Sequence, residues 1–217
     1  AGGAFCAGGD VLDFNERGGE GGGASEVDPA AVAEQLEHQQ LTVGALYRAR
    51  TPVLAAIPGA AAGAGLGLAL AADLRVGSSR ALIVTAFTGV ALSGDFGVAW
   101  LLQQLVGPAK ARELLFLSPR LDAEASAGLG LLDRVCAEDE LEATTLELAR
   151  RLADGPRYAL GLIKQNLLDA THQTLEESMA AEIPRHKSCG ITVDHLGAVQ
   201  AFAAKQQPVF NRAGQGR

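Results

Sequence analysis

Residues 53–73 are mostly small and uncharged, which suits a site that binds a ligand through main-chain N–H groups. VLAAIPGAAAGAGLGLALAAD carries no charge before its final aspartate, and Gly recurs at positions 59, 63, 65 and 67. Residues 53–57 predict a short buried strand, Pro58-Gly59 breaks it, and a helix is expected from Ala64 to about Ala72. A strand that turns into a helix leaves the first helical N–H groups without partners. Because only Gly and Ala stand there, a partly negative ligand atom can approach these donors closely.

Two other interpretations of this stretch compete with a binding site. Its length suits a membrane span with repeated GxxxG spacing, but Ala and Gly give little driving force for insertion and Pro-Gly interrupts the stretch. It is also typical of a tightly packed core helix without a ligand, which the stretch alone favours. A GxGxxG dinucleotide fingerprint is not met, because Leu68 stands where the last Gly is needed.

Two further segments could contribute to an active site, and each also fits a purely structural role. In AFCAGGD at 4–10, a strand fragment is stopped by Ala7-Gly8-Gly9-Asp10, which alone favours a strand-ending turn. Asp95, in LSGDFG, fits as the N-cap of a helix that starts at Phe96, and it fits equally well as a catalytic carboxylate.

The elements that must position these residues change in type along the chain. We expect strands mainly in the first half, at 4–6, 53–57, 74–77, 81–84 and 131–135. Helices are expected at 29–49, 64–72, 98–106, 109–117, from 121 to about 128, and at 139–153, 156–170, 175–186 and 192–205. The polar, Gly-rich residues 17–26 predict a loop. This order indicates an α/β protein with a helical C-terminal region.

Composition narrows the class of protein. At 217 residues the chain suits one domain of ordinary size, and its 48% hydrophobic but only 5% aromatic content predicts a core of Ala, Leu and Val. A net charge of −7 argues against nucleic acid as a partner. The three cysteines lack metal spacing, so we expect free thiols, a reducing cytoplasmic location and no metal site.

Read together, the blocks resemble a known family. AFCAGGD at 4–10 and PVLAAIPGAAAGAGLGLALAADLRV at 52–76 are similar to the two signature blocks of the crotonase superfamily, the enoyl-CoA hydratases and isomerases. LLQQLVGPAKARELLFLSPRLDAEASAGLGLLDRV at 101–135 and DHLGAVQAFAAKQQPVF at 194–210 resemble its later segments. The resemblance implies a crotonase-like spiral of short β-β-α repeats, with a core over residues 1–135 and a helical trimerisation region over 136–217. It also implies that the family's first strands lie upstream of Ala1.

The family resemblance places a thioester carbonyl between two main-chain donors. Matching block to block, these are the N–H groups of Ala7 and Ala64. A thioester enolate carries negative charge on oxygen, and losing one fixed donor to such an oxyanion typically costs about 3 kcal/mol.

The acids expected for hydration are missing from their places in this sequence. Hydratases of the family use two Glu side chains, and the matching positions are Gly67 and Thr85, neither of which titrates. Asp95 matches the place where epoxyphenylacetyl-CoA and some enoyl-CoA isomerases carry an acid and where chlorobenzoyl-CoA dehalogenases carry their nucleophile. One carboxylate suffices to move a proton between carbons, so the resemblance favours isomerisation. We expect an apolar pocket to raise the pKa of Asp95; its predicted members are Phe87, Leu92, Phe96 and Trp100.

The resemblance also implies where coenzyme A lies, as part of the substrate rather than as a cofactor. Its adenine and phosphates are expected along the first block, at Ala4, Cys6, Ala7, Gly8, Gly9, Asp10 and Val11, with the thioester at Gly63 and Ala64. Phe202 and Lys205 match contacts that the family makes from the C-terminal helix of a neighbouring subunit. A homotrimer, or a hexamer of two trimers, is therefore expected. A hydratase with a non-standard acid and a non-catalytic acyl-CoA-binding protein stay open as alternatives.

Overall fold

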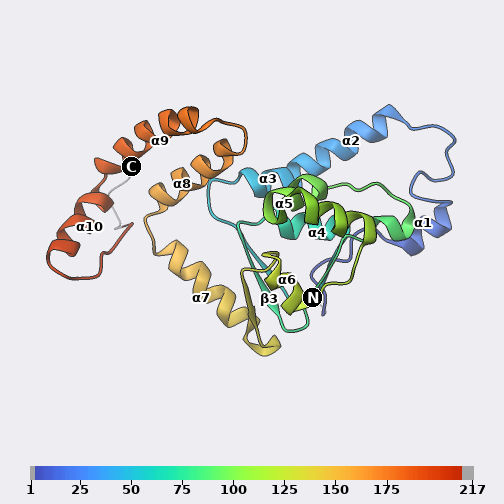
Figure 1. The fold of residues 1–217 in the computed structure, drawn as a ribbon, viewed down its shortest axis with the longest axis horizontal. Coiled ribbons are helices and arrows are strands. Elements are labelled where there is room, and N and C mark those ends of the chain that lie inside the picture. Colours follow the sequence, from blue (N-terminus) through green and yellow to red (C-terminus); the bar gives the residue numbers. More distant parts are fainter. Residues whose placement is uncertain (1–2, 212–217) are drawn as a thin grey trace. The chain divides into compact units, whose positions relative to one another are not determined.

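The computed structural model describes residues 3–211, which form two compact units (Figure 1). The first comprises residues 3–47 and 53–145, and the second residues 48–52 and 146–211. Helix α7, Leu141–Ala153, begins in the first unit and continues into the second.

Two small parallel sheets form the centre of the first unit. One has the order β1-β3-β5 and the other pairs β2 with β4. The strands are β1 Leu54–Ile57, β2 Ala60–Ala62, β3 Leu74–Ser78, β4 Leu82–Val84 and β5 Arg134–Cys136. Because β1 pairs with β3 and β2 with β4, equivalent strands of successive repeats lie side by side. This is the predicted spiral of short β-β-α repeats, and it confirms the fold class.

The uncharged stretch forms the best-buried part of this unit. It supplies β1, β2 and helix α4, Ala64–Leu70, and its residues Ile57, Ala61 and Leu66 are 0% exposed. Asp73 closes the stretch, its carboxylate accepting the Val53 N–H at 2.7 Å. Across residues 3–211, no helix has both the length and the apolar character that a membrane span needs.

The remaining helices of the first unit differ from expectation in three places. They are α1 Val11–Arg17, α2 Pro29–Gln39, α3 Ala45–Arg48, α5 Val98–Leu117 and α6 Ala123–Gly128, with a π-helix at Gln40–Gly44 and 3-10 turns at Phe87–Val90 and Glu138–Glu140. Helix α1 was not expected; it forms because the Asp10 carboxylate accepts the N–H groups of Leu12 and Asp13. The single helix expected over 29–49 is interrupted by the π-helix. Helix α5 joins two expected helices across Gly107, whose φ of +75° breaks the helical path.

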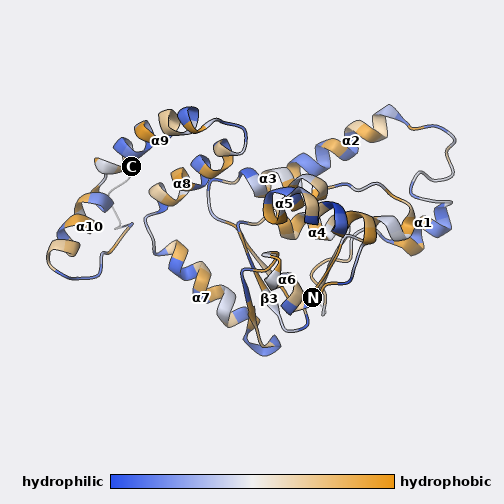
Figure 2. Cartoon of the chain, in the orientation of Figure 1, coloured by the Kyte–Doolittle hydropathy of each residue, from blue (hydrophilic) through white to orange (hydrophobic). Residues whose placement is uncertain are grey.

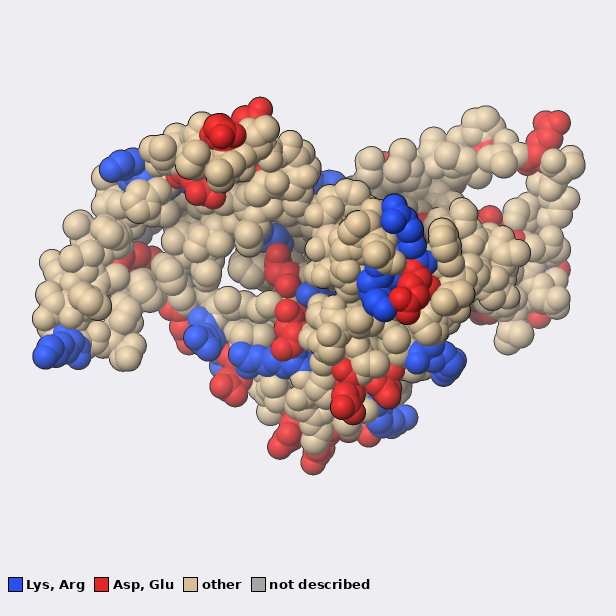
Figure 3. Space-filling model, viewed as in Figure 1, with Lys and Arg blue, Asp and Glu red and all other residues tan. Residues whose placement is uncertain are grey.

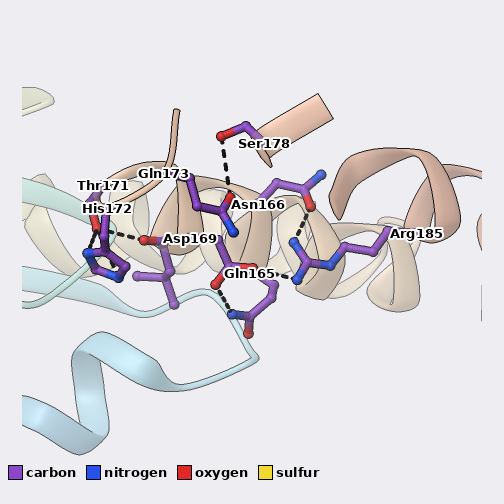
Figure 4. A network of polar contacts seen from close by, with 9 residues as sticks. Gln165, Asn166, Asp169, Thr171, His172, Gln173, Ser178 and Arg185 are labelled. Atoms are coloured by element: carbon purple, nitrogen blue, oxygen red, sulfur yellow. Dashed lines mark hydrogen bonds and ion pairs between the residues drawn. The ribbon is translucent and has the colours of Figure 1, made fainter. Parts of the chain in front are cut away.

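Three helices make up most of the second unit, and polar contacts join two of them. These helices are α8 Arg157–Ala170, α9 Leu175–Gly190 and α10 Val193–Ala203, the last capped by Thr192 as predicted. Arg185 on α9 donates to Asn166 and Asp169 on α8 (Figure 4). The hydrogen bond from Arg185 holds the pKa of Asp169 below its usual range. The pair therefore stabilises the α8–α9 hairpin above the ordinary aspartate pKa, and this contribution is lost as the pH falls through the lowered value.

The surface combines scattered charge with exposed apolar side chains. On the face shown in Figure 3, Lys and Arg are interspersed with Asp and Glu. Hydrophobic residues recur along α9 and α10 (Figure 2). The exposed ones on α10 include Val193, Leu196, Val199 and Phe202.

Candidate active site

A cavity of about 590 Å³ lies in the first unit where the two signature blocks meet. Its wall brings together residues of the first block, the start of α4 and the segment before α5. Of the predicted site residues, it contains Cys6, Ala7, Gly8, Gly9, Val11, Gly63, Ala64, Phe87, Leu92, Asp95 and Phe96.

Backbone pairing holds the two blocks together. Cys6 forms a parallel bridge with Ala61, and the Ala62 N–H donates to the Cys6 carbonyl at 2.9 Å. The two blocks also lie close together at Gly8, where a Cβ would stand 2.9 Å from the Ala62 carbonyl oxygen and 3.3 Å from the Ala64 nitrogen. Only Gly fits there, and its φ of +88° is also one that other residues rarely adopt.

This pairing leaves two main-chain donors at the cavity wall. Ala64 is the first residue of α4, so its N–H has no partner within the helix. Ala7 follows the last residue that pairs with the second block. Within residues 3–211, neither the Ala7 N–H nor the Ala64 N–H donates to a protein acceptor. Both residues line the cavity.

Asp95 is held in the same wall with part of its carboxylate buried. Its Oδ1 atom is buried and has no hydrogen-bond partner in the described part of the chain. Burial raises the pKa of Asp95 above the usual aspartate range, and the negative charge of Glu20 raises it further. Buried oxygens without partners are rare because they cost free energy, and a catalytic role is one reason for which they persist.

The interpretation of Asp95 as an N-cap is wrong. Helix α5 begins at Val98, its N-cap is Gly97, and no side chain in the described part of the chain caps it. Asp95 contributes only its backbone carbonyl, which accepts the Val98 N–H at 3.1 Å. Phe96 and Gly97 both have positive φ, so the chain is not yet helical there and the carboxylate is free for another role.

Comparison with known proteins identifies the family. Residues 1–213 match the family described as Enoyl-CoA hydratase/isomerase. The chain belongs to this family of acyl-CoA-processing enzymes. It is 35% identical over 215 residues to the 1,2-epoxyphenylacetyl-CoA isomerase of Escherichia coli (strain K12), a match that covers 97% of this chain and 78% of that protein.

Two further relatives show how widely the family's chemistry varies. A 4-chlorobenzoyl coenzyme A dehalogenase from Arthrobacter is 32% identical over 162 residues, which cover 75% of this chain and 58% of the dehalogenase. The crystal structure of an enoyl-CoA hydratase from Polaromonas superposes with a TM-score of 0.87 at 30% identity, covering 97% of this chain and 79% of the hydratase. Membership of the crotonase superfamily and its fold are thus established, whereas reaction type differs among its members.

Neither position matched to the hydratase acids offers a proton carrier here. Gly67 lies in α4, and a Cβ on it would stand 2.6 Å from Phe96 Cβ and 2.7 Å from the Phe96 carbonyl oxygen. Phe96 therefore occupies the space that a side chain at position 67 would need. The Thr85 hydroxyl is buried and donates to the Leu114 carbonyl at 2.8 Å.

Several residues predicted for the site lie elsewhere. Trp100 does not line the cavity, and its ring packs edge-on against Tyr47 with centroids 5.3 Å apart. Two residues of the first block, Ala4 and Asp10, do not line the cavity, and Asp10 caps α1 instead. In the second unit, Phe202 is 86% exposed and Lys205 follows the end of α10. Their contact with coenzyme A on a neighbouring subunit stays a prediction.

The cavity also contains polar residues that sequence reasoning missed. Glu20 comes from the Gly-rich segment that was expected to be only a loop, and Gln35 comes from α2. Phe14 of α1 closes against Gly9, where a Cβ would meet the Phe14 ring at 2.8 Å. The Asp10 cap and the apolar residues after it were a local signal for α1. Nothing in the spacing of Glu20 or Gln35 pointed to the cavity.

Proposed function

We propose that this chain isomerises the double bond of an enoyl-CoA thioester, with Asp95 as the single acid and base. The observation that carries the proposal is one cavity wall in which, among residues 3–211, a carboxylate has a buried oxygen without a hydrogen-bond partner and two N–H groups have no acceptor. A carboxylate can move a proton, and the two donors can stabilise the oxyanion that forms when the proton leaves.

The reaction takes two proton transfers and needs no second reactant. The Asp95 carboxylate removes a proton from the saturated carbon next to the thioester carbonyl, and the electron pair of that C–H bond moves through the carbonyl onto the thioester oxygen. The N–H groups of Ala7 and Ala64 bind that oxygen. Protonated Asp95 then returns the proton to a different carbon of the same acyl chain, so the double bond shifts and the carboxylate is regenerated.

The environment of Asp95 suits this role. Phe87, Leu92 and Phe96 line the cavity around it, and burial is the main reason for its raised pKa. A carboxylate with a raised pKa is a stronger base when ionised. The Escherichia coli relative is named as a 1,2-epoxyphenylacetyl-CoA isomerase, and this name supports isomerisation as the reaction type.

The substrate's coenzyme A portion is proposed to lie along the first block, with a trimer as the working assembly. Ala7, Gly9 and Val11, which line the cavity and are exposed, would face the adenine and phosphate groups. Lys205 of a neighbouring subunit would supply positive charge for a phosphate.

Replacement of Asp95 tests the proposal directly. Asp95→Asn should lower the rate of conversion of a 3-enoyl-CoA to its 2-enoyl isomer by about 10²- to 10⁴-fold, the usual contribution of a general base. Binding of the acyl-CoA, measured by calorimetry, should be retained because the two N–H donors are untouched. Unchanged turnover in this variant would refute the proposal.

Hydration is a second candidate because Glu20 lines the same cavity as Asp95. Addition of water across a double bond requires two positioned groups, and Glu20 supplies a second carboxylate from an unexpected place. Loss of enoyl absorbance from crotonyl-CoA, abolished in both Glu20→Gln and Asp95→Asn, would select hydration. Isomerisation predicts no such loss, and isomerase activity that survives in Glu20→Gln.

A further inference from the structure

The turn that carries Asp95 is tied to a distant side chain. Gln39 is the last residue of α2, and its side-chain carbonyl accepts the Phe96 N–H at 2.9 Å, although the two residues are 57 positions apart. Every other residue of α2 is exposed, whereas Gln39 is half-buried. Gln39 is thus the one partly buried residue of α2, and it contacts Phe96, the residue that follows Asp95.

A change in helix type follows immediately after Gln39. Residues Gln40–Gly44 form a π-helix in which Val43 is buried. Short π-helical turns inside α-helices are frequent at functional sites, since the extra residue redirects the side chains around it. Here the π-helix leads from the exposed helix α2 to the buried residue Val43, and it directly follows Gln39, the residue that accepts the Phe96 N–H.

The turn at 94–97 needs such support because of its backbone conformation. Phe96 has a φ of +48°, and left-handed conformations cost a residue with a side chain roughly 1–2 kcal/mol. Conformations of this kind persist only where the surroundings hold them in place. The hydrogen bond to Gln39 is one such restraint, because it satisfies the partly buried N–H of the strained residue.

The second restraint on the turn comes from α4. Phe96 Cβ and the Phe96 carbonyl oxygen press on Gly67, three residues after Ala64. Phe96 is thus held between the end of α2 on one side and the helix that carries a main-chain donor on the other. The position of Asp95 relative to Ala64 depends on both restraints.

We propose that Gln39 is a positioning residue for Asp95, acting through its hydrogen bond to the Phe96 N–H. The inference rests on the proposed function, in which Asp95 is the base. Gln39 does not line the cavity and so contributes no substrate contact of its own. We therefore expect Gln39 to affect the rate of proton transfer, because displacing a catalytic group by about 1 Å can lower the rate by about 10²-fold.

The test compares variants that keep or remove the acceptor at position 39. Gln39→Leu has a similar volume but cannot accept the Phe96 N–H, whereas Gln39→Glu still can. For a 3-enoyl-CoA substrate, Gln39→Leu should lower kcat by up to about 10²-fold while KM stays close to the parent value. Gln39→Glu should restore most of kcat at its own pH optimum. Glu37→Leu, an exposed change on the same helix, is the control and should leave kcat unchanged.

The outcomes separate this inference from the proposed function. If Asp95→Asn abolishes turnover but Gln39→Leu behaves like Glu37→Leu, the inference is wrong and the proposed function stands. Equal losses in Gln39→Leu and Gln39→Glu also overturn the inference, because the acceptor would then be irrelevant. If Asp95→Asn turns over normally, the proposed function fails and the inference fails with it. Should Gln39→Leu not fold, Gln39→Met provides the same comparison without an acceptor.

Discussion

At Asp95, a structural cost accompanies the chemical role that we propose for it. Its half-buried carboxylate has an oxygen without a partner in the described chain, and burial together with Glu20 raises its pKa. Because the folded protein holds the Asp95 proton more tightly than the unfolded chain does, ionisation of this group opposes folding. The contribution of Asp95 to the free energy of unfolding is greatest below the ordinary aspartate pKa, and it falls as the pH rises through the raised pKa of the folded protein.

Because the ionised Asp95 carboxylate opposes folding, its replacement should change the thermal stability. Asp95→Asn should raise the thermal unfolding midpoint near neutral pH, since the uncharged amide removes the cost of a buried negative charge. The gain should vanish below about pH 4, where the carboxyl group is protonated in both states. Thermal unfolding followed by circular dichroism across this pH range measures both effects. A variant that is less stable than the parent at neutral pH would show that Asp95 makes a favourable contact instead.

At the scale of elements, the site depends on two close approaches between segments. The first block reaches α4 through Gly8, and the turn before α5 reaches α4 through Gly67. In each case the glycine hydrogen takes the place of a side chain because backbone atoms lie too near for a Cβ. The short helix α4 thereby receives a donor loop on one side and the carboxylate-bearing turn on the other.

Gly8→Ala tests the first of these approaches. Its Cβ would stand 2.9 Å from the Ala62 carbonyl oxygen at the end of β2 and 3.3 Å from the Ala64 nitrogen, so the first block must move away from the start of α4. We expect kcat/KM to fall by about 10²-fold or more, as when one oxyanion donor is lost. Gly19→Ala is the matched control, because a Cβ there meets nothing within 4 Å and the backbone φ is also positive. Similar losses in both variants would mean that backbone strain, rather than displacement of the donor, is responsible.

Prediction from the sequence succeeded mainly where the signals were local, although the local cap signal at Asp10 was overlooked. The run of small residues indicated β1, the turn and α4, and Thr192 marked the start of α10, since each depends on neighbouring residues. The N-cap interpretation of Asp95 failed because the positive φ of Phe96 is set by distant packing. Gln39 and Glu20 reach the site from far along the chain, and no local pattern distinguishes them from solvent-exposed residues.

For the whole molecule, the second unit carries the feature that most needs explanation. Phe202 is 86% exposed, and Leu196 and Val199 on the same helix are more than half exposed. An isolated chain with such a helix would present apolar surface to water at a cost of about 25 cal/mol per Å². The proposed trimer would cover this surface and bring Lys205 to a neighbouring cavity.

The expected assembly can be measured in solution. Light scattering after size-exclusion chromatography should give the mass of three chains, or of six. Phe202→Glu should shift the mass toward one chain and raise KM for the acyl-CoA, because the contacts from the neighbouring subunit are lost. Glu37→Leu should leave the mass unchanged. A parent protein that elutes as a single chain would contradict the proposed assembly.

The contact between Phe96 and Gly67 also limits how this enzyme can be redesigned. A glutamate placed at position 67, the position matched to a hydratase acid, would collide with the Phe96 backbone before it could meet water or substrate. Libraries that vary residue 67 alone are therefore expected to yield misfolded or inactive protein. An engineered route to water addition has to rebuild the loop at 94–97 in the same step.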